Sequence, residues 1–90
     1  MLTIWKFPLV LEDFQWLWMP HGAELLSVQA QAGKPQLWAL VDPSAVKVKR
    51  SIRTCGTGHS LREEHGKYVG TYQLDGGALV FHVFDMGEER

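Results

Sequence analysis

The residues of this 90-residue chain that could do chemistry gather between Arg50 and His59. Within this stretch, Gly56-Thr57-Gly58-His59 could cradle a phosphate or a ribose, because glycines let backbone N–H groups point inward while threonine and histidine add side-chain donors. A phosphate loop of the strand–loop–helix kind is excluded, since its lysine and the helix that follows it are absent. The alternative interpretation is a turn or bulge that leaves a strand, with His59 exposed to solvent.

Arg50 and Arg53 belong to the one basic cluster of the sequence, Lys47–Arg53. In strand geometry Arg53 lies on the outward basic row, whereas Arg50 interrupts the apolar face of its strand. A buried guanidinium needs an anionic partner, which is either a carboxylate such as Asp42 or Asp85 or the phosphate of a ligand. An internal salt bridge or a register-shifting bulge is the favoured interpretation. If the strand end does not curl, Arg53 rather than Arg50 is the expected phosphate contact.

The remaining reactive side chains give weaker signals. Cys55 is the single cysteine, so an internal disulfide and a cysteine zinc cluster are both excluded. It lies next to the glycine loop and near Arg53 and His59, so a nucleophilic role stays open, although a buried cysteine at a strand end is commonplace. The histidines show no metal-ligand spacing, and His82 is expected to be a satisfied core histidine or a pocket wall. We therefore expect no metal site, no cofactor and no catalytic residue.

Length and composition describe one small folded domain. Apolar residues make up 46% of the chain and charged residues 21%, which excludes intrinsic disorder. The domain is expected to span residues 1–86, followed by a flexible tail at 87–90. A net charge of −1 provides no general field for nucleic acid or an anionic membrane, and no apolar run approaches the about 20 residues of a membrane helix. No signal peptide is recognisable, so the expected location is the cytoplasm.

Turn signals recur at short, regular intervals between runs that are rich in β-branched and aromatic residues. This rhythm is typical of an antiparallel β domain. The predicted fold class is all-β, a small antiparallel sandwich or a partly open barrel of six to seven strands. At most one helical turn is expected, at Ser60–Glu64, where Ser60 and Glu63 have capping-box spacing. The expected strands are Thr3–Phe7, Asp13–Met19, Glu24–Gln31, Gln36–Val41, Val46–Thr54, Tyr68–Gln73 and Leu79–Phe84.

Alternation of side chains assigns the two faces of Glu24–Gln31. Leu26, Val28 and Ala30 are apolar and are expected to face the core. Gln29 and Gln31 then lie on the face that meets solvent or a ligand.

Large aromatic side chains are abundant for a chain of this size. Four tryptophans are more rings than one small core usually hides, so some are expected at a ligand pocket or an oligomer contact. The sequence favours a homo-oligomer, most simply a symmetric dimer. The aromatic residues concerned are Trp5, Phe14, Trp16, Trp18 and Trp38.

Several ordered segments carry a resemblance to a known family, with the pattern WKF…LWALVDP…GTGH…QLxGGALVFHVF. The chain resembles a family of short domains of unknown function that occur mostly in phage, prophage and bacterial genomes. The resemblance spans Ile4 to Phe84, and its last segment, Tyr68–Phe84, is the most specific. The family has no established catalytic residues, so the resemblance implies a setting rather than a mechanism.

That setting implies an accessory protein that counters host defence inside a bacterial cell. The leading hypothesis is a non-enzymatic protein that sequesters a phosphate-bearing nucleotide immune signal, with arginine on the phosphate and an aromatic ring on the base. The alternative is a protein–protein inhibitor of a host defence enzyme, and the third hypothesis is a minor enzyme that uses Cys55 or His59. Nucleic acid is not an expected partner. The candidate ligand-binding residues are Arg50, Arg53, Gly56, Thr57, Gly58, His59, Trp38, Gln29 and Gln31.

Overall fold

The computed structural model describes residues 1–89, and these residues form an all-β fold. Neighbouring strands run antiparallel throughout, so the predicted fold class is confirmed. A short 3₁₀ turn, η1 (Asp75–Gly77), joins the last two strands. The strands are β1 (Thr3–Pro8), β2 (Phe14–Pro20), β3 (Glu24–Gln31), β4 (Lys34–Val41), β5 (Lys47–Gly56), β6 (Lys67–Leu74) and β7 (Leu79–Glu88).

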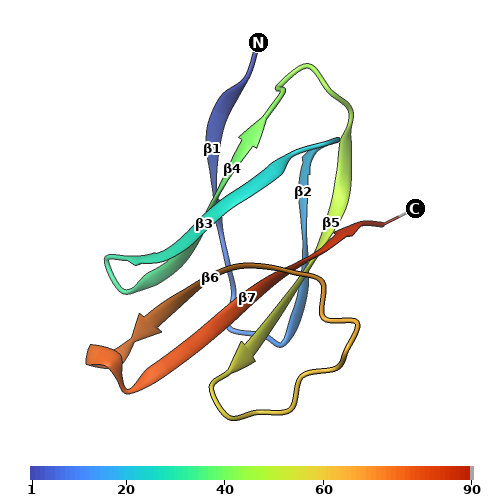
Figure 1. Cartoon of the computed structure of the whole chain (residues 1–90). Coiled ribbons are helices and arrows are strands. Elements are labelled where there is room, and N and C mark those ends of the chain that lie inside the picture. The colour runs from blue at the N-terminus through green and yellow to red at the C-terminus, as the bar shows by residue number, and fades with distance from the viewer. Residues whose placement is uncertain (90) are drawn as a thin grey trace.

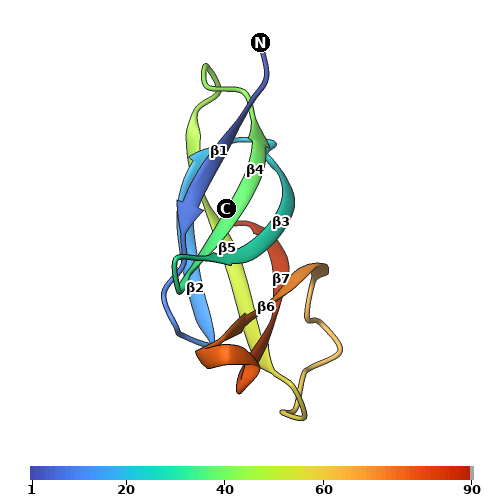
Figure 2. The ribbon, with the colours of Figure 1, turned by 90° about the vertical axis from the view of Figure 1, so that its left-hand side faces the viewer.

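The strands form two sheets, in the orders β1-β4-β3 and β2-β5-β7-β6, which pack together without closing into a barrel. Figure 1 shows the β3–β4 and β6–β7 hairpins pointing in the same direction, one above the other. After a quarter turn, Figure 2 shows β1 and β2 toward one side of the molecule and β3, β6 and β7 toward the other. On that second side β3 and β6 contact each other, with Gly70 of β6 packed against Val28 of β3. On the opposite side β1 and β2, which are edge strands of different sheets, do not pair with each other.

The core lies between the inner faces of the two sheets. Leu37, Ala39 and Val41 alternate along β4, are completely buried, and share one apolar cluster with Ile52 of β5 and Val83 of β7. Burying an aliphatic side chain of this size contributes roughly 1.5–3 kcal/mol. The two sheets are therefore held together by their central strands, which leaves both outer faces available for other contacts.

Bulges in the ladders change which side chains face outward. One residue is extra in each of three places: Leu26 in β3, Val69 in β6 and Met86 in β7. An extra residue reverses the alternation beyond it. Leu26, which was expected in the core, is therefore exposed, and Leu25 packs against the core in its place. The prediction for Leu26 is wrong, as is that for the exposed Ala30, whereas Val28 is buried as predicted.

The segment Ser60–Glu64 contains no helical turn, contrary to the sequence prediction. Residues 57–66 instead follow an irregular path back to the sheet. Tertiary contacts outweigh the capping-box signal there: the backbone carbonyls of His59 and Ser60 face the Cys55 thiol, and the ring of His65 packs on Phe84. Intrinsic helix propensity contributes little to the free energy compared with such packing.

The last strand extends further than expected. Gly87 and Glu88, assigned from sequence to a flexible tail, belong to β7 and pair with Ser51 and Arg50 of β5. The Glu89 N–H continues this pairing by donating to the Lys49 carbonyl at 2.9 Å. The rest of the predicted tail, residue 90, lies outside the described residues.

Candidate functional site

Arg50 points to the inner face of β5 and forms an internal ion pair with Asp85 of β7. Its Nε donates to Asp85 Oδ1 at 2.8 Å and its Nη2 to Oδ2 at 2.7 Å, while both side chains are only 11% exposed. The hydrogen bonds that Arg50 donates to Asp85 outweigh burial and raise the pKa of Arg50. Burial alone would raise the pKa of Asp85, but the bonds from Arg50 and from the Gly87 N–H lower it below its ordinary value. The salt bridge favoured by the sequence is thus present, and the Arg50 guanidinium is committed to it.

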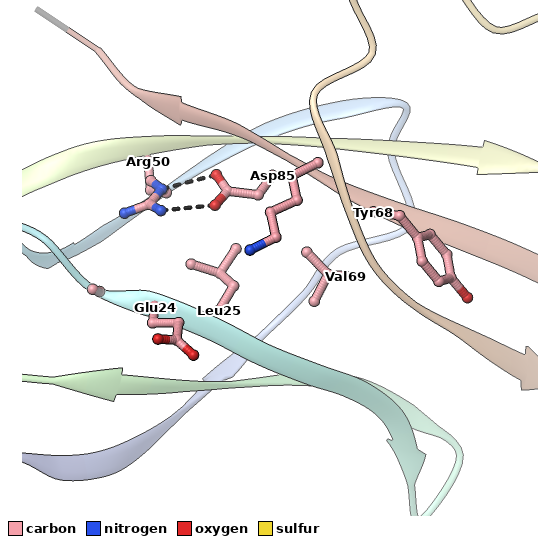
Figure 3. Close-up of a pocket in the computed structure, with 8 residues that line it drawn as sticks. Glu24, Leu25, Arg50, Tyr68, Val69 and Asp85 are labelled. Carbon is pink, nitrogen blue, oxygen red and sulfur yellow. Dashed lines mark hydrogen bonds and ion pairs between the residues drawn. The ribbon is translucent and has the colours of Figure 1, made fainter.

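A pocket of about 230 Å³ lies beside this ion pair, between β3 and the β5–β7–β6 part of the larger sheet. Figure 3 shows Arg50 and Asp85 joined by two bonds at one end, with Leu25 and Val69 forming an apolar wall. Glu24 adds a second carboxylate to the lining. Lys67 also lines the pocket, so two cations and two carboxylates face it. Because the Arg50 guanidinium is already bound by Asp85, the pocket offers no net positive charge to the anionic ligand that the sequence analysis predicts.

The Gly56–His59 loop forms a turn at the end of β5. The His59 N–H donates to the Gly56 carbonyl at 3.1 Å, Gly58 has a φ of 85°, and the Thr57 N–H bonds Val80 on β7. The His59 ring covers Gly56 so closely that a Cβ there would lie 3.2 Å from two ring atoms. The loop lines a surface hollow of about 250 Å³ with the start of β7. Two of its backbone N–H groups are thus engaged within the protein, which agrees with the turn interpretation.

A chain of hydrogen bonds that the sequence analysis missed crosses the outer face of the larger sheet. His82 Nε2 lies 2.6 Å from Thr57 Oγ1, and its Nδ1 lies 2.9 Å from Thr71 Oγ1. Thr71 Oγ1 also lies 2.5 Å from the Tyr68 hydroxyl. His82 is therefore satisfied by side chains, as expected, but on the outer face rather than in the core. Only the strand register, which pairs Thr71 with His82, could have revealed this chain.

Cys55 is buried, and its environment does not favour a nucleophile. The thiol lies 3.5–3.8 Å from the backbone carbonyl oxygens of Gly56, His59 and Ser60. Carbonyl oxygens accept a hydrogen bond from the S–H group, and they provide no positive charge or donor to stabilise a thiolate. Neither Arg53 nor the His59 ring forms a hydrogen bond with Sγ among the described residues. The geometry therefore favours a structural cysteine.

Trp38, Gln29 and Gln31 lie on the outer face of the smaller sheet. The register pairs Trp38 of β4 with Ser27 of β3 and Gln29 with Gln36, on the face opposite the buried Leu37. Gln31 Oε1 accepts a hydrogen bond from Lys6 Nζ at 2.8 Å. Because the two sheets pack through their inner faces, these residues are on the opposite side of the sandwich from Arg53. The candidate residues of the sequence analysis therefore do not form one site.

Arg53 lies on the outer face of the larger sheet, where β5 pairs with β2. Its guanidinium carbon lies 4.4 Å from the centroid of the Phe14 ring, and Nη1 donates to the Asp13 and Thr54 carbonyls at 3.4 and 3.2 Å. Asp13 Oδ2 is 3.9 Å away, but the Asp13 side chain is 82% exposed, so solvent screens this contact. The guanidinium of Arg53 is thereby held in place by stacking and by hydrogen bonds to the backbone.

Two hollows flank Phe14 on this face. The first, about 200 Å³, is lined by Arg53 with residues of the 57–66 connection; the second, about 280 Å³, is lined by Trp16 and β5. Phe14 and Met86 belong to both, so the hollows are neighbours along one groove. We call this surface the Phe14 groove. Its principal lining residues are Phe14, Trp16, Arg53, Arg62, His65 and Met86.

The profile of one protein family matches residues 1–90. The chain belongs to DUF7352. This family is described as a domain of unknown function, so the membership that the sequence resemblance predicted, in a family of such domains, is confirmed. Comparisons of the DUF7352 chain with curated proteins and with solved structures gave no match.

Most of the Phe14 groove in this DUF7352 domain could not be predicted from the sequence. Phe14 and Trp16 were singled out as surplus aromatics, and Arg53 as a phosphate contact, but nothing in the linear order joined them to Arg62, His65 or Met86. The bulge at Met86 turns this side chain outward, and the irregular 57–66 connection places Arg62 and His65 nearby. Neither feature has a clear sequence signal.

Residues 1–89 contain no group of three or more His, Cys, Asp or Glu side chains arranged to hold a metal ion. No helix among them is long and apolar enough to cross a membrane.

Proposed function

We propose that this DUF7352 domain binds a phosphate-bearing nucleotide in the Phe14 groove, without catalysing a reaction on it. The observation that carries the proposal is the position of Arg53, a guanidinium stacked on Phe14 at 4.4 Å and facing a hollow of about 200 Å³. An aromatic ring and an arginine side by side are the two groups needed for a base and a phosphate.

Charge supports an anionic ligand at this end of the groove. Arg53 and Arg62 both line the hollow, together with His65, whereas Glu64 is its one carboxylate. Arginine presents several N–H donors in a planar fork, which suits the oxygens of a phosphate. Because Arg53 is held by Phe14 and by backbone carbonyls, it loses little conformational freedom when a ligand arrives.

Aromatic surface supports a planar base at the other end. Phe14 is 64% and Trp16 46% exposed, and both line the second hollow. Stacking of a base on an aromatic ring contributes roughly 1–3 kcal/mol and requires no particular base. Each hollow alone is smaller than a usual ligand site, but the two together fall within the range of about 300–1,000 Å³.

The biological role that we propose is sequestration. The resemblance to phage and prophage domains suggests that the ligand is a nucleotide signal of host immunity, bound in the cytoplasm of a bacterial cell so that it cannot reach its receptor. A sponge of this kind needs affinity and no turnover, which fits a groove with stacking and charge but a buried cysteine.

Thermal unfolding with a panel of ligands tests the proposal. Inorganic phosphate, nucleosides, mononucleotides and cyclic dinucleotides should separate the contributions of phosphate and base. A ligand at about 100 times its dissociation constant adds about 2.7 kcal/mol, equivalent to roughly 10–20 °C in a domain of this size. If no nucleotide raises the midpoint while the protein remains folded, the domain is not a nucleotide sponge.

Two variants locate the site. Arg53→Gln should lower the affinity of the best nucleotide roughly 10- to 100-fold, because a charge-assisted hydrogen bond contributes about 1.5–3 kcal/mol. Trp38→Ala, on the opposite outer face, is the matched control and should leave binding unchanged. A loss of binding in Trp38→Ala with Arg53→Gln unaffected would place the ligand on the smaller sheet instead.

A second candidate function is inhibition of a host defence enzyme through a protein contact. Trp16 and Trp18 form an edge-to-face pair with centroids 5.5 Å apart, and both are about half exposed. Exposed tryptophans of this kind often anchor interfaces. In this case a purified defence enzyme would be inhibited by the wild type and not by Trp18→Ala, with nucleotides having no effect.

A further inference from the structure

The strand β2 is an edge strand of the larger sheet. No strand of residues 1–89 forms hydrogen bonds with its outer edge. Two bonds at the ends of β2 show which of its residues pair with β5. The Thr54 N–H donates to the carbonyl of Asp13, just before β2, at 2.8 Å, and the His21 N–H, just after β2, donates to the carbonyl of Val46, just before β5, at 2.7 Å. Between these bonds every second residue of β2 directs its N–H and C=O groups toward β5. The N–H and C=O groups of Phe14, Trp16 and Trp18 therefore point away from the sheet.

This edge lacks the protection that the other sheet edges have. The strands β3 and β6 contain bulges and lie against each other, and β1 carries Lys6 and Pro8. In contrast, β2 has the sequence FQWLWMP, with no charge and with proline only at its last residue. An uncharged edge strand of seven residues is a template for pairing with another strand.

We propose that β2 pairs with β2 of a second copy, antiparallel, around a two-fold axis at Trp16. In this register Trp16 lies opposite Trp16 of the second copy, and Phe14 lies opposite Trp18. Each of these three residues donates its free N–H and accepts at its free C=O, so the pairing satisfies the whole edge. Such an interface is self-complementary, as a two-fold dimer requires. Its aromatic cross-strand pairs add to the main-chain bonds.

The flanks of this pairing are complementary in charge. Glu12 and Asp13 precede β2, whereas Lys47 lies beside Pro20 at its other end. Antiparallel pairing about Trp16 brings Glu12 of one copy opposite Pro20 of the other, next to Lys47. The same contact recurs across the two-fold axis. Charges at the rim of an interface guide association and discriminate against wrong registers.

The area available predicts a weak dimer. Phe14, Trp16 and Trp18 are 64%, 46% and 54% exposed. With large rings of about 200 Å² each, pairing buries on the order of several hundred Å², at the low end of specific interfaces. The dimer should therefore dissociate on dilution into the micromolar range. Phe14 and Trp16 also line the Phe14 groove, so the dimer and a bound nucleotide would share these two rings. The pairing itself requires no ligand, and sedimentation of the ligand-free protein therefore tests it separately from the proposed nucleotide site.

Sedimentation of the full chain over a range from micromolar to several hundred micromolar tests the association itself. We expect a reversible shift from monomer to dimer, and a strict monomer at the highest concentration overturns the proposal. Trp16→Pro removes an N–H that faces away from β5, so it should abolish the dimer while the circular dichroism of the fold persists. Trp16→Val keeps this N–H and should weaken the dimer less. Equal losses in the two variants would contradict main-chain pairing.

Cysteine cross-linking tests the register. In a hydrogen-bonded antiparallel pair the Cα atoms lie about 5.5 Å apart, within the range of a disulfide. Trp16→Cys should therefore form a covalent dimer under mild oxidation. Trp18→Cys should not, because the two copies of position 18 are about 13 Å apart along the strands. The wild type controls for Cys55, and cross-linking of Trp18→Cys equal to that of Trp16→Cys would overturn the register.

Discussion

At the scale of single residues, Arg50 shows how far a sequence argument can reach. An arginine within an apolar strand face needs a carboxylate, and Asp85 was one of two named from sequence. The choice between Asp42 and Asp85 depends on the strand register, which places Ile52 opposite Asp85 and so brings Arg50 within 2.7 Å of it. Asp42 instead accepts hydrogen bonds from Ser44 in its own turn. The need for a partner was predictable, but its identity required the fold.

Removing one member of this ion pair should destabilise the domain strongly. Arg50→Met leaves the Asp85 carboxylate largely buried and without its guanidinium, which costs roughly 3 kcal/mol or more. Chemical denaturation measures the loss. The control is the double variant Arg50→Met/Asp85→Leu, which leaves no buried charge at either position and should recover much of the stability. If the double variant loses as much as, or more than, the sum of the losses in Arg50→Met and Asp85→Leu, the two charges do not act as a coupled pair.

The same pair makes stability depend on pH in a defined direction. The pKa of Asp85 lies below its ordinary value of 3.8 in the folded protein. Its contribution to stability is therefore complete above pH 3.8 and is lost as the pH falls through the folded value. Asp85→Asn should be less stable than the wild type at pH 7, and this difference should shrink below pH 3.8 in denaturation curves. A difference that is constant between pH 7 and pH 3 would contradict the assignment.

At the scale of elements, the strands were largely predictable and the irregular parts were not. Alternation and turn residues located each strand, and β3 was predicted with its observed bounds, Glu24–Gln31. Bulges such as the one at Leu26 have no sequence signal, since they arise from how two strands share a register. The 57–66 connection follows contacts with the sheet rather than its own propensity. These two kinds of feature are the ones that build the Phe14 groove.

Two glycines of that connection offer a matched test of its packing. Gly58 and Gly66 have almost equal φ values, 85° and 84°, but a Cβ at Gly66 would lie 2.3 Å from the Asp85 carbonyl oxygen, whereas nothing lies within 4 Å at Gly58. Gly58→Ala should cost about 1–2 kcal/mol from backbone strain alone. Gly66→Ala adds a backbone clash and should cost roughly 2–4 kcal/mol. Equal losses in denaturation midpoints would show that the 57–66 connection moves away freely from β7.

At the scale of the whole molecule, the two sheets separate residues that looked equivalent in the sequence. Arg53 lies on one outer face and Trp38, Gln29 and Gln31 on the other, because the inner faces of both sheets are filled by the core. Sequence alternation alone indicates that a residue faces outward, but it cannot say on which of two outer faces. The candidate residues could therefore be recognised one at a time, and their division into two surfaces required the topology.

The most direct test of the nucleotide site is a map of backbone amide shifts by nuclear magnetic resonance, with the nucleotide that gives the largest thermal shift. The proposal predicts that the perturbed amides cluster at Phe14, Arg53 and His65, and that Trp38 and Gln29 on the opposite face remain unperturbed. Perturbations centred on Trp38 would contradict the assignment of the Phe14 groove. An unchanged spectrum at saturating nucleotide would contradict nucleotide binding altogether.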